Sequence, residues 1–158
     1  MKTVRIAAKL LALLLVLTFV LLPFVGCKKK EQNVNGYCTV VVATDPATEY
    51  KVDLDKVTVD NGLISIFEYL KANEGFTYEM QESTYGAFLT KVLTLDSTAV
   101  ENGFITLMTS VEKDFDVSAY ALEQTYNGTK IVTSGLGASS MTIEAGAVYY
   151  IALSIYNG

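Results

Sequence analysis

The 158-residue sequence contains no histidine and no tryptophan, and it has only two cysteines and two prolines. Without histidine, the Ser-His-Asp and Cys-His nucleophile pairs cannot form, and no metal site can use an imidazole ligand. The sequence also lacks a phosphate-binding loop of the Gly-Lys-Ser type. These absences argue against an ordinary hydrolase, so we expect a protein that is not an enzyme and that uses no cofactor or metal.

The N-terminal segment has the pattern of an export signal. Three basic residues precede Leu10–Leu22, which carries no charge, and this order is typical of a secretory signal peptide. Residues 23–27, Pro-Phe-Val-Gly-Cys, resemble the bacterial lipobox, in which the cysteine receives a diacylglyceryl group and becomes the mature N-terminus. We therefore predict a lipoprotein signal peptide over residues 1–26 and lipidation of Cys27. The alternative is an uncleaved membrane anchor, because the apolar run approaches the length that spans a bilayer.

Either anchor would place the rest of the chain at the extracellular face of the bacterial cytoplasmic membrane. Residues 27–36 are polar and predict a lipidated tether, and the three lysines after Cys27 favour an anionic membrane surface. Residues 27–158 contain nine Lys and Arg residues and 17 Asp and Glu residues, which gives this part of the chain a formal charge of −8. We predict no nucleic-acid partner, because such a partner needs the opposite sign. With Cys27 alkylated, Cys38 has no disulfide partner and is expected to be a buried apolar residue.

Residues 60–75 predict the main helix of the mature domain. Its apolar residues recur at the spacing of one helix face, with polar residues on the other side. They are Leu63, Ile66, Phe67 and Leu70. Asp60 or Asn61 can cap the start of this helix, and Asn73 with Gly75 can supply the left-handed residue that closes its end.

Most of the other apolar or alternating runs predict β-strands. These runs are residues 37–43, 50–59, 76–81, 88–95, 104–110, 130–133, 141–143 and 148–155. A one-residue change of phase near Asp55 indicates a bulge or a tight turn in the second run. Many strands, with a single helix after the second strand, predict an α+β domain over residues 37–158. In such a domain a mostly antiparallel sheet packs on one main helix.

Two motifs that would carry chemistry are incomplete. Residues 135–140 begin like a dinucleotide-binding fingerprint, but the third glycine is missing and a strand follows where a helix is needed. Asp114 and Asp116 have the spacing of the first calcium-loop ligands, yet Ala119 and Thr125 replace the required glycine and glutamate. We interpret this second stretch as a solvated acidic loop. A pair of carboxylates acting on a glycan is the remaining enzymatic alternative.

Aromatic side chains supply the candidate ligand contacts. Tyrosine is plentiful in the second half of the sequence, and aromatic rings stack on flat ligands or sugars while a hydroxyl stays in water. Loops around residues 83–88, 96–104 and 111–127 are predicted to form the contact surface. The predicted ligand-binding residues are Tyr85, Phe88, Phe104, Tyr120 and Tyr126. For any single tyrosine, packing in the core or at a sheet edge is the alternative.

Four segments are similar to the transcobalamin-like C-terminal domain family, a bacterial domain of unknown function. They are residues 60–70, a glycine followed by an apolar helix; 85–92, a glycine-led strand; 104–110; and 143–150, a closing turn and strand. The resemblance runs from about Thr39 to Tyr156 and implies a β-grasp-like fold. By analogy with cobalamin carriers, it implies capture of a soluble ligand, which we expect to be corrinoid-like or a glycan. It does not imply cobalamin itself, because in those carriers the domain works with a separate helical domain.

The export signal, the acidic charge and the resemblance lead to one functional hypothesis. We expect a lipid-anchored, non-enzymatic module that binds a soluble ligand at the cell surface and reaches the membrane through lipidated Cys27. The alternative is a protein-interaction module of a surface assembly, which would dock a surface protein through a sheet edge or exposed aromatics.

Overall fold

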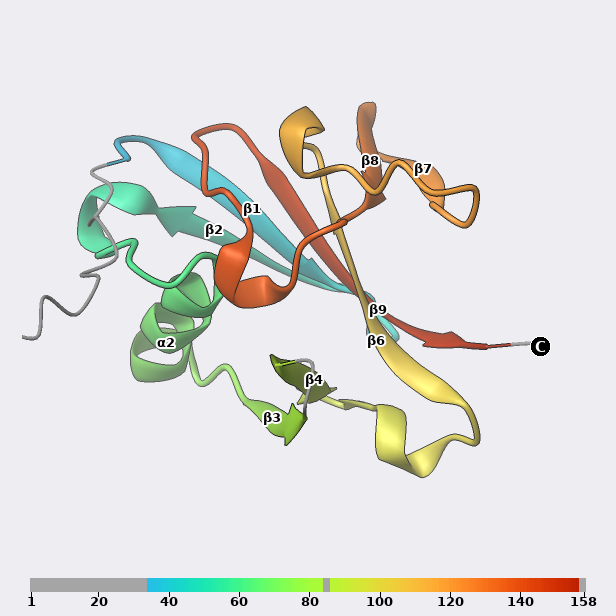
Figure 1. Cartoon of the computed structure of the whole chain (residues 1–158). Coiled ribbons are helices and arrows are strands. Elements are labelled where there is room, and N and C mark those ends of the chain that lie inside the picture. The colour runs from blue at the N-terminus through green and yellow to red at the C-terminus, as the bar shows by residue number, and fades with distance from the viewer. Residues whose placement is uncertain (1–33, 84–85, 157–158) are drawn as a thin grey trace, which may run out of the picture.

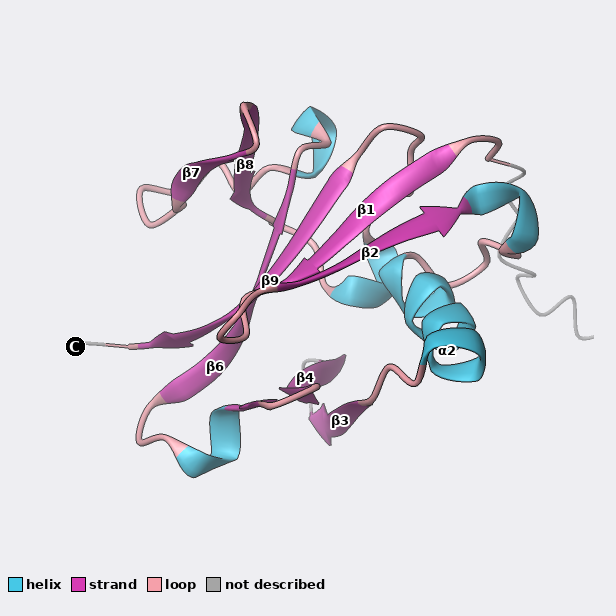
Figure 2. Cartoon of the chain, turned by 180° about the vertical axis from the view of Figure 1, so that it is seen from behind, coloured by secondary structure: helices cyan, strands magenta, loops and turns pink. Residues whose placement is uncertain are grey.

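The computed structural model describes residues 34–83 and 86–156, which form two sheets and one main helix. The predicted signal peptide, the Cys27 lipidation site and most of the tether lie outside the described residues. Figures 1 and 2 show helix α2, Leu63–Glu74, across one face of the larger sheet, with the smaller sheet beside it. This arrangement confirms the predicted α+β fold, in which a mostly antiparallel sheet packs on one main helix.

The strands largely follow the predicted apolar runs. The larger sheet contains β1 (Tyr37–Val42), β2 (Thr48–Asp53), β6 (Gly103–Thr109), β7 (Glu123–Tyr126), β8 (Thr129–Thr133) and β9 (Val148–Ile155). The smaller sheet contains β3 (Tyr78–Ser83), β4 (Gly86–Val92) and β5 (Leu95–Asp96). Short 3-10 turns connect them: η1 (Leu54–Lys56), η2 (Ser97–Ala99), η3 (Glu112–Asp114) and η4 (Ala138–Ser140). The first of these turns lies where the change of phase near Asp55 was predicted.

The larger sheet has the strand order β2-β1-β9-β6-β8-β7. Its neighbouring strands run antiparallel except β1 and β9, which run parallel with Thr39 opposite Val148. The longest pairing joins β6 to β9 and covers the whole of β6. The last strand of the chain therefore lies in the middle of the sheet.

Helix α2 buries the face predicted from its apolar spacing. The residues of that face are Leu63, Ile66, Phe67 and Leu70, each at most 1% exposed. Gly75 ends the helix in a left-handed conformation, and its N–H donates to the Leu70 carbonyl, as the sequence predicts. Burying each of these side chains contributes about 1.5 to 3 kcal/mol, so the helix is a main source of stability. Within the described ranges, no helix is long and apolar enough to cross a membrane.

The start of α2 differs from the prediction. Gly62 is the N-cap residue, and no side chain caps the helix. The Asp60 carboxylate instead accepts a hydrogen bond from the Ser65 hydroxyl at 3.0 Å, and the same hydroxyl oxygen accepts the Asn61 N–H at 2.9 Å. The predicted capping by Asp60 or Asn61 is therefore wrong, because both residues are held by Ser65 one turn into the helix.

Two predicted strands also differ in the structure. Residues 88–95 fall into β4 and β5, because Leu93 adopts a left-handed conformation with φ of 51° and turns the chain between them. The Leu93 N–H donates to the Thr77 carbonyl at 2.9 Å, which fixes this turn. Residues 141–143 contribute buried Met141 and Ile143 but pair with no strand in the part of the chain that the structure describes.

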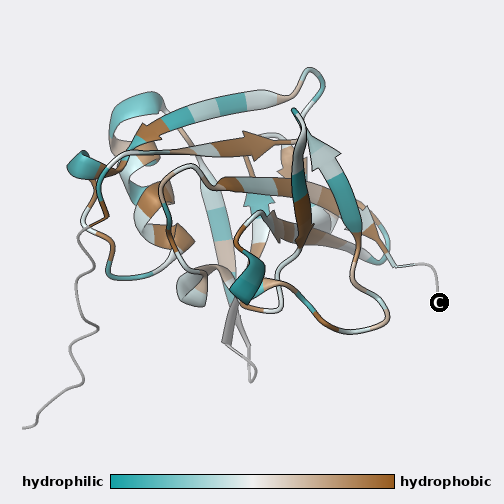
Figure 3. Cartoon of the chain, turned by 90° about the horizontal axis from the view of Figure 1, so that it is seen from above, coloured by the Kyte–Doolittle hydropathy of each residue, from teal (hydrophilic) through white to brown (hydrophobic). Residues whose placement is uncertain are grey.

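Apolar side chains cover both faces of the larger sheet. The face under α2 carries the main core, whereas the opposite face carries a smaller cluster with partly buried Tyr126 and Tyr150 at its rim. That smaller cluster consists of Val41, Met108, Ile131 and Val148. Figure 3 shows that β1 is largely hydrophobic whereas the edge strand β2 is largely hydrophilic. This contrast follows from position, since β1 is covered on both faces and β2 borders solvent.

Candidate functional site

A groove of about 410 Å³ lies beside β6, where the two sheets and the start of α2 meet. This volume lies within the range of ligand pockets, roughly 300 to 1,000 Å³. Four parts of the chain line the groove: Asn61 and Ile64 of the helix start, Met80, Phe88 and Leu89 of the β3–β4 hairpin, Phe104–Leu107 of β6, and Thr133, Ser134 and Leu136–Ser139 after β8. The groove is therefore built from residues far apart in sequence.

Exposed apolar side chains gather at this groove. Met80, Phe88, Phe104 and Leu136 are between 39% and 49% exposed. Among the described residues that line the groove, none is charged, and their polar atoms belong to hydroxyl, amide and backbone groups. Covering these side chains would remove apolar surface from water, so the groove favours an uncharged ligand with an apolar part.

Met80 differs from the alternating pattern of its strand. The pattern predicts Met80 on the same apolar face as Phe76 and Tyr78. In the structure Phe76 is buried in the core, whereas Met80 is exposed in the groove. The pairing with β4 shifts at this point, because Thr90 of β4 is skipped between the pairs Glu79–Lys91 and Met80–Leu89.

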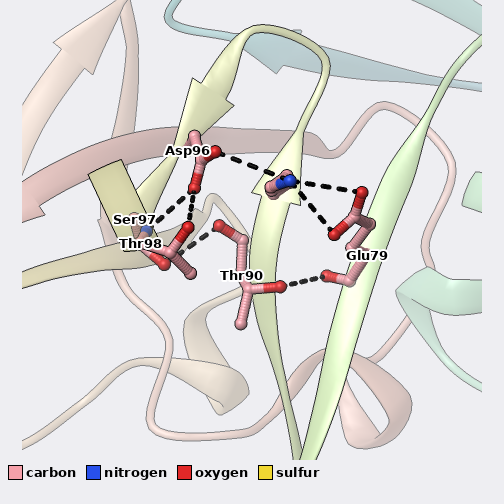
Figure 4. Close-up of polar contacts among 6 residues, drawn as sticks. Glu79, Thr90, Asp96, Ser97 and Thr98 are labelled. Atoms are coloured by element: carbon pink, nitrogen blue, oxygen red, sulfur yellow. Dashed lines mark hydrogen bonds and ion pairs between the residues drawn. The ribbon is translucent and has the colours of Figure 1, made fainter. Parts of the chain in front are cut away.

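A polar network holds the hairpin in place (Figure 4). The Lys91 ammonium lies 3.3 Å from the Glu79 carboxylate on β3 and 3.6 Å from the Asp96 carboxylate on β5. Asp96 also accepts the Thr98 N–H at 2.9 Å and the Thr98 hydroxyl at 2.6 Å. The Thr98 hydroxyl lowers the pKa of the Asp96 carboxyl, and the hydrogen bond to Glu79 raises the pKa of the Lys91 ammonium. The network thus ties β3, β4 and β5 together on the surface.

A buried carboxylate anchors the opposite wall of the groove. Asp114 is 2% exposed, and its carboxylate accepts the Thr142 N–H at 2.6 Å and the Thr142 hydroxyl at 2.9 Å. The Asp114 backbone carbonyl accepts the Gly135 N–H at 2.8 Å. These bonds hold both ends of the segment that carries Leu136. The prediction of a solvated acidic loop is therefore wrong at Asp114, whose carboxylate has a structural partner.

The start of α2 approaches the same wall closely. Gly62 has a positive φ of 55°, and an added Cβ would lie 2.6 Å from the Ala138 carbonyl oxygen and 2.9 Å from the Met141 carbonyl oxygen. Only glycine fits this combination of conformation and contact. The glycine lets η4 pack on the helix start and so positions the groove residues on both sides.

The structure brings together two of the five predicted ligand-binding residues. Phe88 on β4 and Phe104 on β6 line the same groove. Tyr120 is 89% exposed in the loop before β7, and Tyr126 packs on the opposite face of the larger sheet, so neither lines the groove. Tyr85 lies outside the described residues. A ligand-binding role for all five stays a prediction.

Other groove residues were not predicted from the sequence. Met80 and Leu136 carry the same kind of exposed apolar surface as the two phenylalanines. The glycines and serines of residues 134–140 were a usable signal, since small residues suit a loop that approaches a ligand closely. No comparable local signal marks Met80, because its alternation with Phe76 and Tyr78 predicts a core position.

The largest pKa changes lie away from the groove. Burial raises the pKa of the Cys38 thiol to about 12, and this cysteine is buried as predicted. Burial, together with the hydrogen bond to Glu68, raises the pKa of the Tyr78 hydroxyl to about 12. Burial also raises the pKa of Tyr149, whose hydroxyl donates to the Thr142 carbonyl at 2.8 Å. These groups stay protonated near neutral pH, and they belong to the packing of the domain.

Comparison with known proteins identifies related folds. No protein-family model matches the sequence, and no curated protein matches it. A candidate metal-binding protein from Ruminococcus gnavus ATCC 29149 aligns with a TM-score of 0.52 at 13% identity, covering 78% of this chain and 100% of that chain. Haptocorrin in complex with Cbi aligns with a TM-score of 0.52 at 17% identity, covering 81% of this chain and 27% of haptocorrin.

These likenesses concern the fold. The match to haptocorrin supports the transcobalamin-like fold implied by the resemblance, although this chain corresponds to only about a quarter of that protein. Residues 34–83 and 86–156 contain no group of three or more His, Cys, Asp and Glu that could hold a metal ion. The groove beside β6 is therefore the site on which we base a functional proposal.

Proposed function

We propose that this protein is a non-enzymatic binding module that captures a soluble, uncharged and partly apolar ligand in the groove beside β6. The observation that carries this proposal is the convergence of four exposed apolar side chains on one uncharged groove. These side chains are Met80, Phe88, Phe104 and Leu136. Contiguous exposed apolar surface of this kind commonly marks an interaction site. The fold shared with haptocorrin, a protein solved with Cbi bound, is consistent with such a role.

The lining of the groove selects among ligand chemistries. The rings of Phe88 and Phe104 offer faces on which a sugar or another flat group can stack. Hydroxyl groups of Thr133 and Ser134 add hydrogen-bonding capacity near the apolar surface. A volume of about 410 Å³ suits a small ligand or one part of a larger one, such as the edge of a corrinoid.

Titration with the neutral fluorescent dye Nile red tests the groove. The wild-type protein is expected to bind the dye, and Phe88→Ala is expected to weaken binding about tenfold, because the variant removes apolar contact area from the groove wall. Tyr120→Ala is the matched control, since it truncates an exposed aromatic residue that lies outside the groove. Its dye affinity is expected to equal that of the wild type.

Competition against the bound dye then addresses ligand class. A corrinoid and soluble cell-wall glycans are the first competitors, because these are the two ligand classes expected from the sequence. Displacement by one of them would assign the class. Equal dye affinity in the wild type and in Phe88→Ala, or loss of binding in Tyr120→Ala alone, would contradict a site in the groove.

We also propose that lipid on Cys27 holds this module at the extracellular face of the cytoplasmic membrane. The support is the uncharged run that ends in a lipobox-like sequence. Mass spectrometry of the protein extracted from bacterial membranes is expected to show a first residue of Cys27 carrying a diacylglyceryl group. The Cys27→Ser variant is expected to carry no lipid and to be lost from the membrane fraction, whereas the Cys38→Ala variant is expected to keep the lipid. Any other mature N-terminus would contradict the anchor.

A further inference from the structure

Strand β6 lines the groove with four consecutive residues, Phe104–Leu107. Successive side chains of a strand point to opposite faces of the sheet, so a cavity on one face would contact alternate residues only. Thr106 does not fit such a cavity. It is buried and its hydroxyl donates to Ser154 on β9, yet the residue still borders the groove. The groove therefore runs along the edge of β6.

This edge of β6 is only partly paired. Strand β8 pairs with the last two residues of β6, and beyond them the Ser134 N–H donates to the Leu107 carbonyl at 2.8 Å. At the other end, the Gly103 N–H donates to the Val100 carbonyl at 3.0 Å. Between Gly103 and Leu107, no strand among the described residues pairs with this side of β6.

The backbone groups of Ile105 face the open part of this edge. In an antiparallel strand, both backbone groups of every second residue point to the same side. Gly103 and Leu107 make bonds on the side away from β9, so Ile105, which lies midway between them, points its N–H and C=O to that side as well. Neither group has a backbone partner there in residues 34–83 and 86–156. An unpaired strand edge can accept another strand.

We propose that the groove binds an extended peptide segment, which adds a short strand to β6. This inference rests on the proposed binding function and narrows its ligand class. A peptide residue opposite Ile105 accepts the Ile105 N–H and donates its own N–H to the Ile105 carbonyl. Its side chain lies on the face that carries Ile105 and Leu107, and Phe88 covers the peptide from the β4 side.

The open edge defines the length and chemistry of the peptide. Four steps of about 3.4 Å from Gly103 to Leu107 make roughly 14 Å, which accommodates about four peptide residues. The central residues of the peptide are uncharged, because a charge would lose its water in a groove whose described residues include no charged group to compensate it. An apolar or alternating stretch of a partner protein has this chemistry.

A random heptapeptide library displayed on phage tests the proposal with the full mature chain. Peptides enriched on the wild type relative to Phe88→Ala are expected to share an uncharged, apolar centre. The most enriched peptide is then synthesised with one backbone nitrogen methylated at a time. Methylation of one nitrogen is expected to weaken binding by about tenfold or more, because it removes the donor to the Ile105 carbonyl. Methylation of the nitrogens on either side is expected to have little effect, since they point away from β6.

Amide hydrogen exchange gives a readout at the strand itself. At saturating peptide, exchange of the Ile105 N–H is expected to slow by about tenfold or more, because the bound strand protects it. The Thr106 N–H, which faces β9, serves as the internal control and is expected to keep its exchange rate. Dye binding by the wild type provides the separate test of the groove.

Three results would each overturn the peptide proposal: no enriched peptide, tolerance of every single methylated nitrogen, or unchanged exchange at Ile105. If Nile red still binds in the Phe88-dependent manner, the proposed binding function survives without the peptide. If the dye does not bind either, both proposals fail.

Discussion

Replacing Phe67 with alanine is expected to lower the free energy of unfolding by about 3 to 5 kcal/mol. Phe67 is fully buried on α2, and its ring centroid lies 5.0 Å from that of Phe76 and 5.4 Å from that of Tyr78. Truncation removes these contacts and leaves a cavity under the helix that its neighbours fill only in part. Since a small domain is stable by only about 5 to 15 kcal/mol, the variant should lie near the limit of folding.

Urea denaturation followed by circular dichroism measures this loss. Phe104→Ala is the matched control, because it removes the same atoms at a position that is 45% exposed. Its loss is expected to be about 1 kcal/mol or less. Similar losses in the two variants would contradict the view that α2 packed on the larger sheet forms the core of the domain.

Replacing Gly62 with alanine is expected to lower the free energy of unfolding by more than about 3 kcal/mol. A positive φ costs a residue with a side chain about 1 to 3 kcal/mol. The larger part of the loss comes from contact, because the new Cβ would lie 2.6 Å from the Ala138 carbonyl oxygen, and neither backbone can yield without moving η4 or the helix start.

Gly75→Ala measures the cost of a positive φ without a close contact, at a ψ of 19° where Gly62 has a ψ of −136°. Gly75 lies at the other end of the same helix with a positive φ of 69°, and nothing lies within 4 Å of an added Cβ. Its loss is expected to be about 1 to 2 kcal/mol, which reflects the backbone conformation alone. Nile red affinity is expected to fall in Gly62→Ala and to persist in Gly75→Ala, because only Gly62 contacts the groove wall. Equal stability of the two variants would rule out the close approach described for Gly62.

The helix could be predicted from sequence because its determinants are local. The spacing of Leu63, Ile66, Phe67 and Leu70 defines one face over two turns, and Gly75 ends the helix within the same stretch. Strand β9 is equally local, since its apolar run coincides with the strand from Val148 to Ile155. Strand β1 was predicted as well, but its parallel pairing with β9 could not be predicted, because that pairing joins the two ends of the domain.

The groove depends on contacts between distant residues and was only partly predictable. The alternating pattern predicts Met80 in the core, whereas the fold exposes it in the groove, and the anchoring of the Leu136 segment comes from Asp114 and Thr142. Aromatic character pointed to Phe88 and Phe104, but it pointed equally to Tyr120, which the fold places elsewhere. Residue type identifies candidate ligand-binding residues, but only the tertiary arrangement shows which of them lie in the groove.

The central position of β9 has a consequence for how this molecule comes into being. Thr39 and Val148 are neighbours across the parallel pair although 109 positions separate them along the chain. Closing so long a loop is entropically costly and slows folding. Strand β9, residues 148–155, lies between β1 and β6, so the β1–β2 hairpin cannot join β6 in one sheet before these residues are present. A polypeptide that is synthesised or exported from its N-terminal side therefore joins β1 to β6 only after residues 148–155 have emerged.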